Sequence, residues 1–174
     1  MIVGDALKAA GLLLLAGLLQ VSIFSTLEVA EGHPDIVLVL VVAIALLRGP
    51  LFASVAGFWA GLVLDVASLE TLGLSSLLLT LAGYFAGRFG EATTRSSAHP
   101  QLVAVALATI GVGFGSAVLN FMLGSSIGAS VFFVGVLLPT LALNLLLAYP
   151  LYGLCRRIFG VVPRVPAREV TAAV

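Results

Sequence analysis

The chain has few charged residues and only one cysteine, and both shortages restrict what it can be. Charged residues make up 9% of its 174 residues and hydrophobic ones 61%, whereas about 25% of a soluble domain is charged. A chain with so little charged surface is not a soluble globular protein, and without a dense basic patch it does not bind nucleic acid. We therefore expect an integral membrane protein, surrounded by the lipid bilayer.

Side chains that support catalysis or metal binding are also scarce. The single cysteine, Cys155, forms neither an internal disulfide nor a multi-cysteine metal site, and His33 and His99 are far from it and from each other in the sequence. The short motifs of serine hydrolases, zinc peptidases and phosphate-binding loops do not occur. We expect no enzymatic activity, no cofactor and no metal.

Long apolar runs, by contrast, cover most of the chain. About 20 apolar residues are needed to cross roughly 30 Å of hydrocarbon. The runs predict an all-α membrane protein, a bundle of six transmembrane helices in one domain (1–160) with a short cytoplasmic tail (161–174). The expected spans are 6–26, 35–47, 51–64, 72–87, 101–123 and 131–155. The second and third are short, and Arg48, Gly49 and Pro50 between them favour a tight hairpin.

Basic residues are confined to one side of this predicted topology. With six spans, all eight Lys and Arg residues fall on the side that carries both termini. The opposite side holds acidic residues and no basic one: Glu28, Glu31, Asp35, Asp65 and Glu70. The positive-inside rule therefore predicts that both termini are cytoplasmic. No charged residue is expected between the two faces, which argues against ion-coupled transport.

Small residues recur at helical spacing in three of the predicted spans, a pattern that lets membrane helices approach closely. The stripes are Ala53, Gly57 and Gly61; Gly83 and Gly87; and Ala104, Ala108, Gly111 and Gly115. We expect them to pack within the bundle, with an intermolecular seam as the alternative. Asn120 and Asn144 are expected to hydrogen-bond across helix interfaces.

Two aspartates at the outer side allow different interpretations. Asp35 follows Pro34 at a helix start, where a carboxylate is favourable. Asp65 ends a helix, where a carboxylate is unfavourable, so we expect it to organise the loop to the fourth span. A pair of aspartates that shares a proton would instead indicate an intramembrane protease, and this requires direct contact between Asp35 and Asp65.

Several short motifs follow one another in an order that resembles a known family. Pro34 and Asp35 precede an aliphatic run that ends at Arg48, Gly49 and Pro50. The residues that follow are 57–62, Asp65, Ser68, Leu72, Gly73, Gly83, Tyr84 and Gly87. This order resembles the rod shape-determining protein MreD family over roughly residues 10–155. The candidates for family motifs or partner contacts are Pro34, Asp35, Arg48, Gly49, Gly57, Gly61, Asp65, Gly73, Gly83 and Tyr84.

The resemblance implies a non-catalytic scaffold in the bacterial inner membrane. Members of the family bind MreC, a single-span protein, and with it link cytoplasmic MreB filaments to the peptidoglycan polymerase and transpeptidase outside. The expected function is therefore to maintain cell shape in the rod complex, with the MreC transmembrane helix bound against one small-residue face. The family also resembles the six-helix substrate-binding subunits of energy-coupling-factor vitamin transporters. A substrate-binding transporter subunit is therefore the alternative.

Overall fold

The protein is helical throughout the part of the chain that the structure describes. This structure is a computed structural model that describes residues 2–24, 33–69, 71–93, 99–124 and 132–160. Of these residues 91% are helical and none lies in a β-strand, so the all-α prediction is confirmed. The elements are α1 (Ile2–Leu19), η1 (Gln20–Phe24), α2 (Ile36–Arg48), α3 (Pro50–Ser68), α4 (Leu74–Ala92), α5 (His99–Met122), η2 (Phe132–Leu137) and α7 (Leu138–Phe159).

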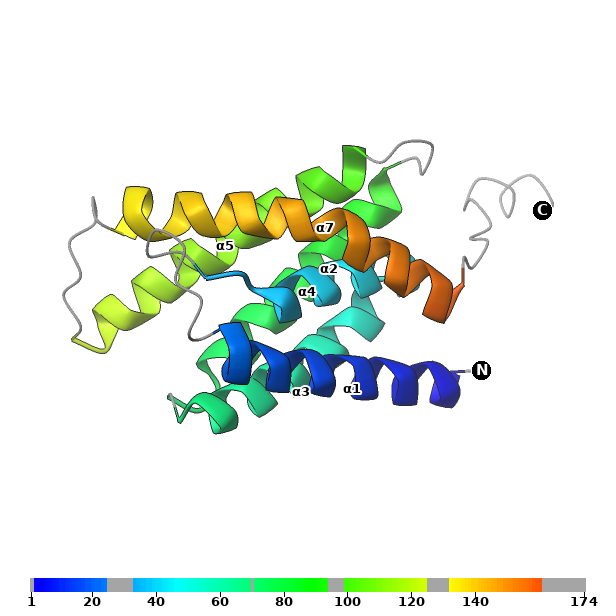
Figure 1. Ribbon diagram of the computed structural model, residues 1–174, viewed down its shortest axis with the longest axis horizontal. Helices are drawn as coiled ribbons and strands as arrows, with labels where there is room; N and C mark the ends of the chain where they lie inside the picture. The colour runs from blue at the N-terminus through cyan, green and yellow to red at the C-terminus, as the bar shows by residue number, and fades with distance from the viewer. Residues whose placement is uncertain (1, 25–32, 70, 94–98, 125–131, 161–174) are drawn as a thin grey trace, which may run out of the picture.

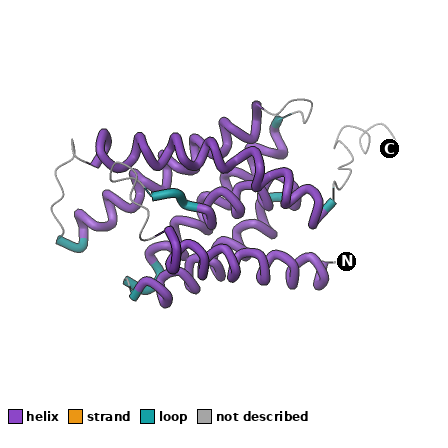
Figure 2. The backbone as a smooth tube through the Cα atoms, viewed as in Figure 1, coloured by secondary structure: helices purple, strands orange, loops and turns teal. Residues whose placement is uncertain are grey.

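Helix α2 lies among the other helices of the bundle (Figure 1, Figure 2). Its sequence is aliphatic on every side, which is typical of a helix that is buried all round. All residues from Val37 to Leu47 are buried, because α1, α3, α4, α5 and α7 each contact this helix. Its 13 residues extend about 20 Å, which is less than the hydrocarbon thickness of a bilayer.

The described basic residues gather at one end of the bundle, which we call the basic end. The first turns of α1, the end of α2 and the end of α7 meet there, since Arg48 contacts both Asp5 and Phe159. The end of α4 joins them, because Gly87 lies against Pro50. The basic residues placed at this end are Lys8, Arg48, Arg88, Arg156 and Arg157. Arg95, Arg164 and Arg168 lie outside the described residues.

Four helical segments are long and apolar enough to cross a membrane. They are Gly4–Ser22, Pro50–Ser68, Pro100–Met122 and Gly135–Phe159. Helix α2 is too short for this criterion, and α4 is interrupted by polar residues and carries Arg88 and Glu91 near its end. The expected count of six spans is therefore not confirmed by length and composition.

The connections between helices differ from the prediction where helices extend beyond the expected spans, as α3 does to Ser68 and α4 to Ala92. A single residue, Gly49, joins α2 to α3, with a φ of 96° that favours glycine; its N–H donates to the Ala45 carbonyl and its carbonyl accepts from Ala53. The tight turn expected there is confirmed. The loop expected at 88–100 is shorter, because α4 continues through Arg88 to Ala92 and α5 begins at His99.

Candidate functional site

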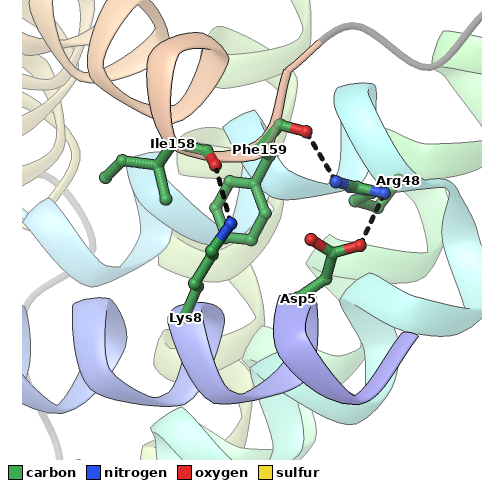
Figure 3. Close-up of polar contacts among 5 residues, drawn as sticks. All are labelled: Asp5, Lys8, Arg48, Ile158 and Phe159. Carbon is green, nitrogen blue, oxygen red and sulfur yellow. Dashed lines mark hydrogen bonds and ion pairs between the residues drawn. The ribbon is translucent and has the colours of Figure 1, made fainter. Parts of the chain in front are cut away.

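A polar cluster at the basic end joins three helices, as Figure 3 shows. The Arg48 guanidinium, in the last turn of α2, pairs with the Asp5 carboxylate of α1 at 2.8 Å. It also donates a 2.6 Å hydrogen bond to the Phe159 carbonyl of α7 and lies 5.6 Å from the centre of the Phe159 ring. The Lys8 ammonium donates to the neighbouring Ile158 carbonyl at 3.5 Å. Arg48 therefore links α1, α2 and α7 from the last turn of α2, where a positive charge is favourable.

A second polar network surrounds the other end of α2. Asp35 is the N-cap, and its Oδ1 accepts hydrogen bonds from the Leu38 N–H at 3.0 Å and from Gln20 Nε2 at 3.3 Å. The Asp35 N–H donates to Asn144 Oδ1 at 2.8 Å, and Gln20 Oε1 accepts from the Val37 N–H at 3.0 Å. Two amide side chains from α7 and η1 thus satisfy the first backbone N–H groups of a buried helix, which have no partner within the helix itself.

The α5–α7 side of this network is buried, whereas Asp35 and Gln20 are half-buried. Asn144 is fully buried, and its amide nitrogen donates to Thr109 Oγ1 at 3.1 Å; both residues are near the middle of their helices. Asp35 and the buried Pro34 directly precede α2, whose 13 residues place them about 20 Å from Arg48 at its other end. The Asp35 carboxylate is held there by the first turn of α2 and by Gln20.

The two asparagines expected to cross helix interfaces behave differently. Asn144 connects α7 to Thr109 of α5 and to Asp35, so that prediction is confirmed. Asn120 instead donates to the Ser116 carbonyl at 2.9 Å, within its own helix. The prediction for Asn120 is wrong because its side chain returns to the backbone one turn earlier.

Asp65 organises the connection from α3 to α4, as expected. Its buried carboxylate accepts hydrogen bonds from the Gly73 N–H at 2.7 Å and the Ser75 N–H at 3.1 Å. Gly73 is the N-cap of α4, with a φ of 95°. The N–H groups at the start of α4 therefore offset the unfavourable position of a carboxylate at the end of α3.

The two aspartates do not form a catalytic pair in the described part of the chain. Asp35 binds Gln20 and the first turn of α2, whereas Asp65 binds the start of α4. No hydrogen bond joins their carboxylates among the described residues, and a shared proton would require one. The geometry does not support the hypothesis of an intramembrane protease.

The glycines of α3 and α4 form the contact between these two antiparallel helices. A Cβ atom added at Gly83 would lie 2.6 Å from the Ala53 carbonyl oxygen. Cβ atoms added at the other three would overlap backbone atoms of the facing helix: Gly57 with Leu79, Gly61 with Ser76, and Gly87 with Pro50. These glycines allow close backbone approach. The expected packing within the bundle is confirmed for both stripes, whose faces are filled.

The third small-residue stripe does not form a continuous packed face. Ala104 is buried and Gly115 lies against the Leu78 side chain, but a Cβ added at Gly111 would have no neighbour within 4 Å. The stripe therefore faces the bundle at Ala104 and Gly115 and open space at Gly111. The expected intramolecular packing is wrong at Gly111.

Tyr84 and other aromatic residues lie on the exposed side of the α3–α4 pair. Tyr84 is 45% exposed, and its ring packs edge to face on Phe85 with centroids 5.6 Å apart. Phe58 and Trp59 of α3, also exposed, form a similar pair at 6.0 Å. Of the candidates, Tyr84 is the one whose side chain is largely free to contact lipid or a partner.

Several residues of these clusters were not among the candidates. Asp5 and Gln20 complete the clusters at the two ends of α2, and the buried Gln101 donates to the Ala148 carbonyl between α5 and α7. A polar residue within an apolar run is the signal that was available for Gln20. Asp5 gave no such signal, because acidic residues near a chain end are common.

Comparisons with known proteins add a family match to this geometry. The family model described as rod shape-determining protein MreD matches residues 5–159 of the chain. No curated protein and no solved structure matches the chain. These results give no support to the alternative of a substrate-binding transporter subunit.

Proposed function

The chain belongs to the rod shape-determining protein MreD family, and from this premise we propose that it is a scaffold that binds the transmembrane helix of MreC. The family consists of structural, shape-determining membrane proteins and is not a known enzyme family, so a role in rod-shape determination follows from membership. In the proposal, MreC connects this scaffold to MreB filaments and to the peptidoglycan polymerase and transpeptidase.

The proposed topology has six crossings of the bacterial inner membrane, with the basic end in the cytoplasm. Helices α2 and α4 supply the two crossings that length and composition do not identify. Because α2 is shielded by five other helices, it does not itself need to match the thickness of the lipid. Helix α1 begins and α7 ends at the basic end, as an even number of crossings requires, and the basic residues there favour the cytoplasmic side.

The observation that carries the proposal is the open position of Gly111 on α5. Leu107 and Phe114, one turn away on either side, are 58% and 56% exposed, and Val118 is 41% exposed. A glycine between large apolar side chains leaves a notch in which a second transmembrane helix can approach the backbone. The stripes of α3 and α4 offer no such notch, because each already receives the other helix.

Co-purification of MreC with glycine variants tests this assignment. Gly11 of α1 and Gly153 of α7 are also open, with no atom within 4 Å of an added Cβ, so Gly11→Phe and Gly153→Phe are matched controls for Gly111→Phe. We expect all three variants to fold, and only Gly111→Phe to reduce capture of MreC in mild detergent, by at least about tenfold, as for a blocked central contact. Native-like capture by Gly111→Phe would exclude the α5 face, and failure of the folded native chain to capture MreC would refute the proposed function.

A further inference from the structure

The charges at the basic end are unevenly compensated. Two of its basic residues have acidic partners: Arg48 pairs with Asp5 at 2.8 Å, and Arg88 with Glu91 at 3.2 Å. Lys8, Arg156 and Arg157 have no acidic partner in the described part of the chain. The positive charge that remains is therefore concentrated in these three residues, which we call the basic patch.

The basic patch lies where α1 meets the last turn of α7. Lys8 reaches from α1 to the Ile158 carbonyl (Figure 3), and Arg156 and Arg157 directly precede that residue. All three patch residues are exposed. Arg156 and Arg157 thus lie within one helical turn of the carbonyl that Lys8 contacts.

The backbone at the end of α7 does not oppose an anion as strongly as a free helix end does. The last carbonyls of a helix carry partial negative charge when they have no partner. Here the Arg156 carbonyl accepts from the Gly160 N–H at 3.0 Å, the Ile158 carbonyl from Lys8, and the Phe159 carbonyl from Arg48. The field at this helix end is therefore dominated by the cations.

The surface next to the patch is apolar. Leu7, beside Lys8, is 76% exposed, and Leu154, just before the arginines in α7, is 42% exposed. On α7, Leu154 lies deeper in the bundle than the two arginines, in the same order as the acyl chains and phosphate of a phospholipid, whereas Leu7 lies level with Lys8 at the end of the bundle. An acidic protein segment would leave the exposed leucines without a partner.

We propose that the basic patch binds the phosphate group of an anionic phospholipid, with its acyl chains against Leu154. Lys8, Arg156 and Arg157 provide the charge, and arginine offers paired N–H donors for phosphate oxygens. This site is separate from the α5 face assigned to MreC, and it depends on the charges of the basic end and not on the identity of the partner protein.

Lipid retention by the full-length chain tests this proposal. The purified protein is mixed with phosphatidylglycerol or phosphatidylcholine in detergent, and bound lipids are counted by native mass spectrometry. Basic residues near a membrane surface contribute enough binding energy for about a fivefold effect each, so the variant K8Q/R156Q/R157Q is expected to bind phosphatidylglycerol on the order of a hundredfold more weakly. Arg88→Gln, which removes a compensated cation from the same end, is expected to bind it as the native chain does.

Three results would overturn the proposal. They are equal retention of the two lipids by the native chain, native-like retention of phosphatidylglycerol by the triple variant, and complete displacement of the lipid by soluble glycerol phosphate at equal concentration. The single variant Arg157→Gln covers the case in which the triple variant does not fold. Arg157 is exposed and forms no ion pair with any described residue, so we expect the variant to fold. Its binding of phosphatidylglycerol is expected to be about fivefold weaker.

Discussion

Two regions of this bundle are held together in different ways. In the α3–α4 pair, four glycines bring the backbones of two antiparallel helices into contact. Around α2, the connections to α1, α5 and α7 are instead made by polar side chains at its two ends, and several glycines of these outer helices face open space. One region therefore depends on the absence of side chains, and the other on particular side chains.

The comparison shows which small-residue patterns indicate contact within a chain. Gly57 and Gly61 of α3 are matched by Gly83 and Gly87 of α4, so that each helix presents small residues where the other approaches. On the α5 stripe, Gly115 instead faces the large Leu78 side chain of α4, and Gly111 is open. Reciprocal spacing on consecutive helices predicts an intramolecular seam, whereas a single stripe leaves the partner undetermined.

The largest effect is expected from filling the α3–α4 seam. In Gly61→Leu, the new side chain would overlap the backbone of Ser76, which cannot move aside as a flexible side chain does. We expect a loss of about 3 kcal/mol or more in the free energy of unfolding, and consequently little folded protein. Size-exclusion chromatography and a denaturation titration in mixed micelles measure this. A native-like profile for Gly61→Leu would show that the two backbones are further apart than described.

A smaller effect is expected from breaking the polar network at the start of α2. Asn144→Leu leaves the Asp35 N–H without its acceptor and removes the donor to Thr109. Leaving a buried group unpaired costs about 2 kcal/mol, and the same titration measures the loss. Asn120→Leu is the matched control, since Asn120 bonds only within its own helix, and its effect should remain within about 0.5 kcal/mol. Equal effects of the two variants would contradict the linking role of Asn144.

The opposite end of α2 should be less sensitive. Arg48→Gln removes the ion pair with Asp5 and the hydrogen bond to the Phe159 carbonyl. Both arginine and aspartate are partly exposed there, with side chains 15% and 13% accessible, so we expect a loss of about 1 kcal/mol. Arg88→Gln, which breaks an exposed pair within one helix, is expected to change stability by no more than about 0.5 kcal/mol. Unfolding midpoints of the two variants measure this difference. An equal shift in both would contradict the role of Arg48 in linking α1, α2 and α7.

Local features of this fold could be predicted from the sequence, and distant contacts could not. The turn at Gly49 and the loop-organising role of Asp65 each depend on residues close together in the chain. The Arg48–Phe159 hydrogen bond joins residues 111 positions apart, and the Asp35–Asn144 bond joins residues 109 apart. Hydrophobic periodicity along the chain does not predict which of two such distant residues will be in contact. For the same reason, the sequence identifies Asp35 as a helix start but not Asn144 as its partner.

No loss of stability is expected at the open glycine of α5. Gly111→Leu adds a side chain where no atom lies within 4 Å of the new Cβ, and leucine favours helix more than glycine by almost 1 kcal/mol. The free energy of unfolding of the isolated chain should therefore stay the same or rise by up to about 1 kcal/mol, in contrast to Gly61→Leu. The two variants differ only in where the same leucine is placed, so a denaturation titration of both compares a filled helix face with an open one. A large loss in Gly111→Leu would mean that another part of the chain covers this face, and the notch assigned to MreC would then be closed by the protein itself.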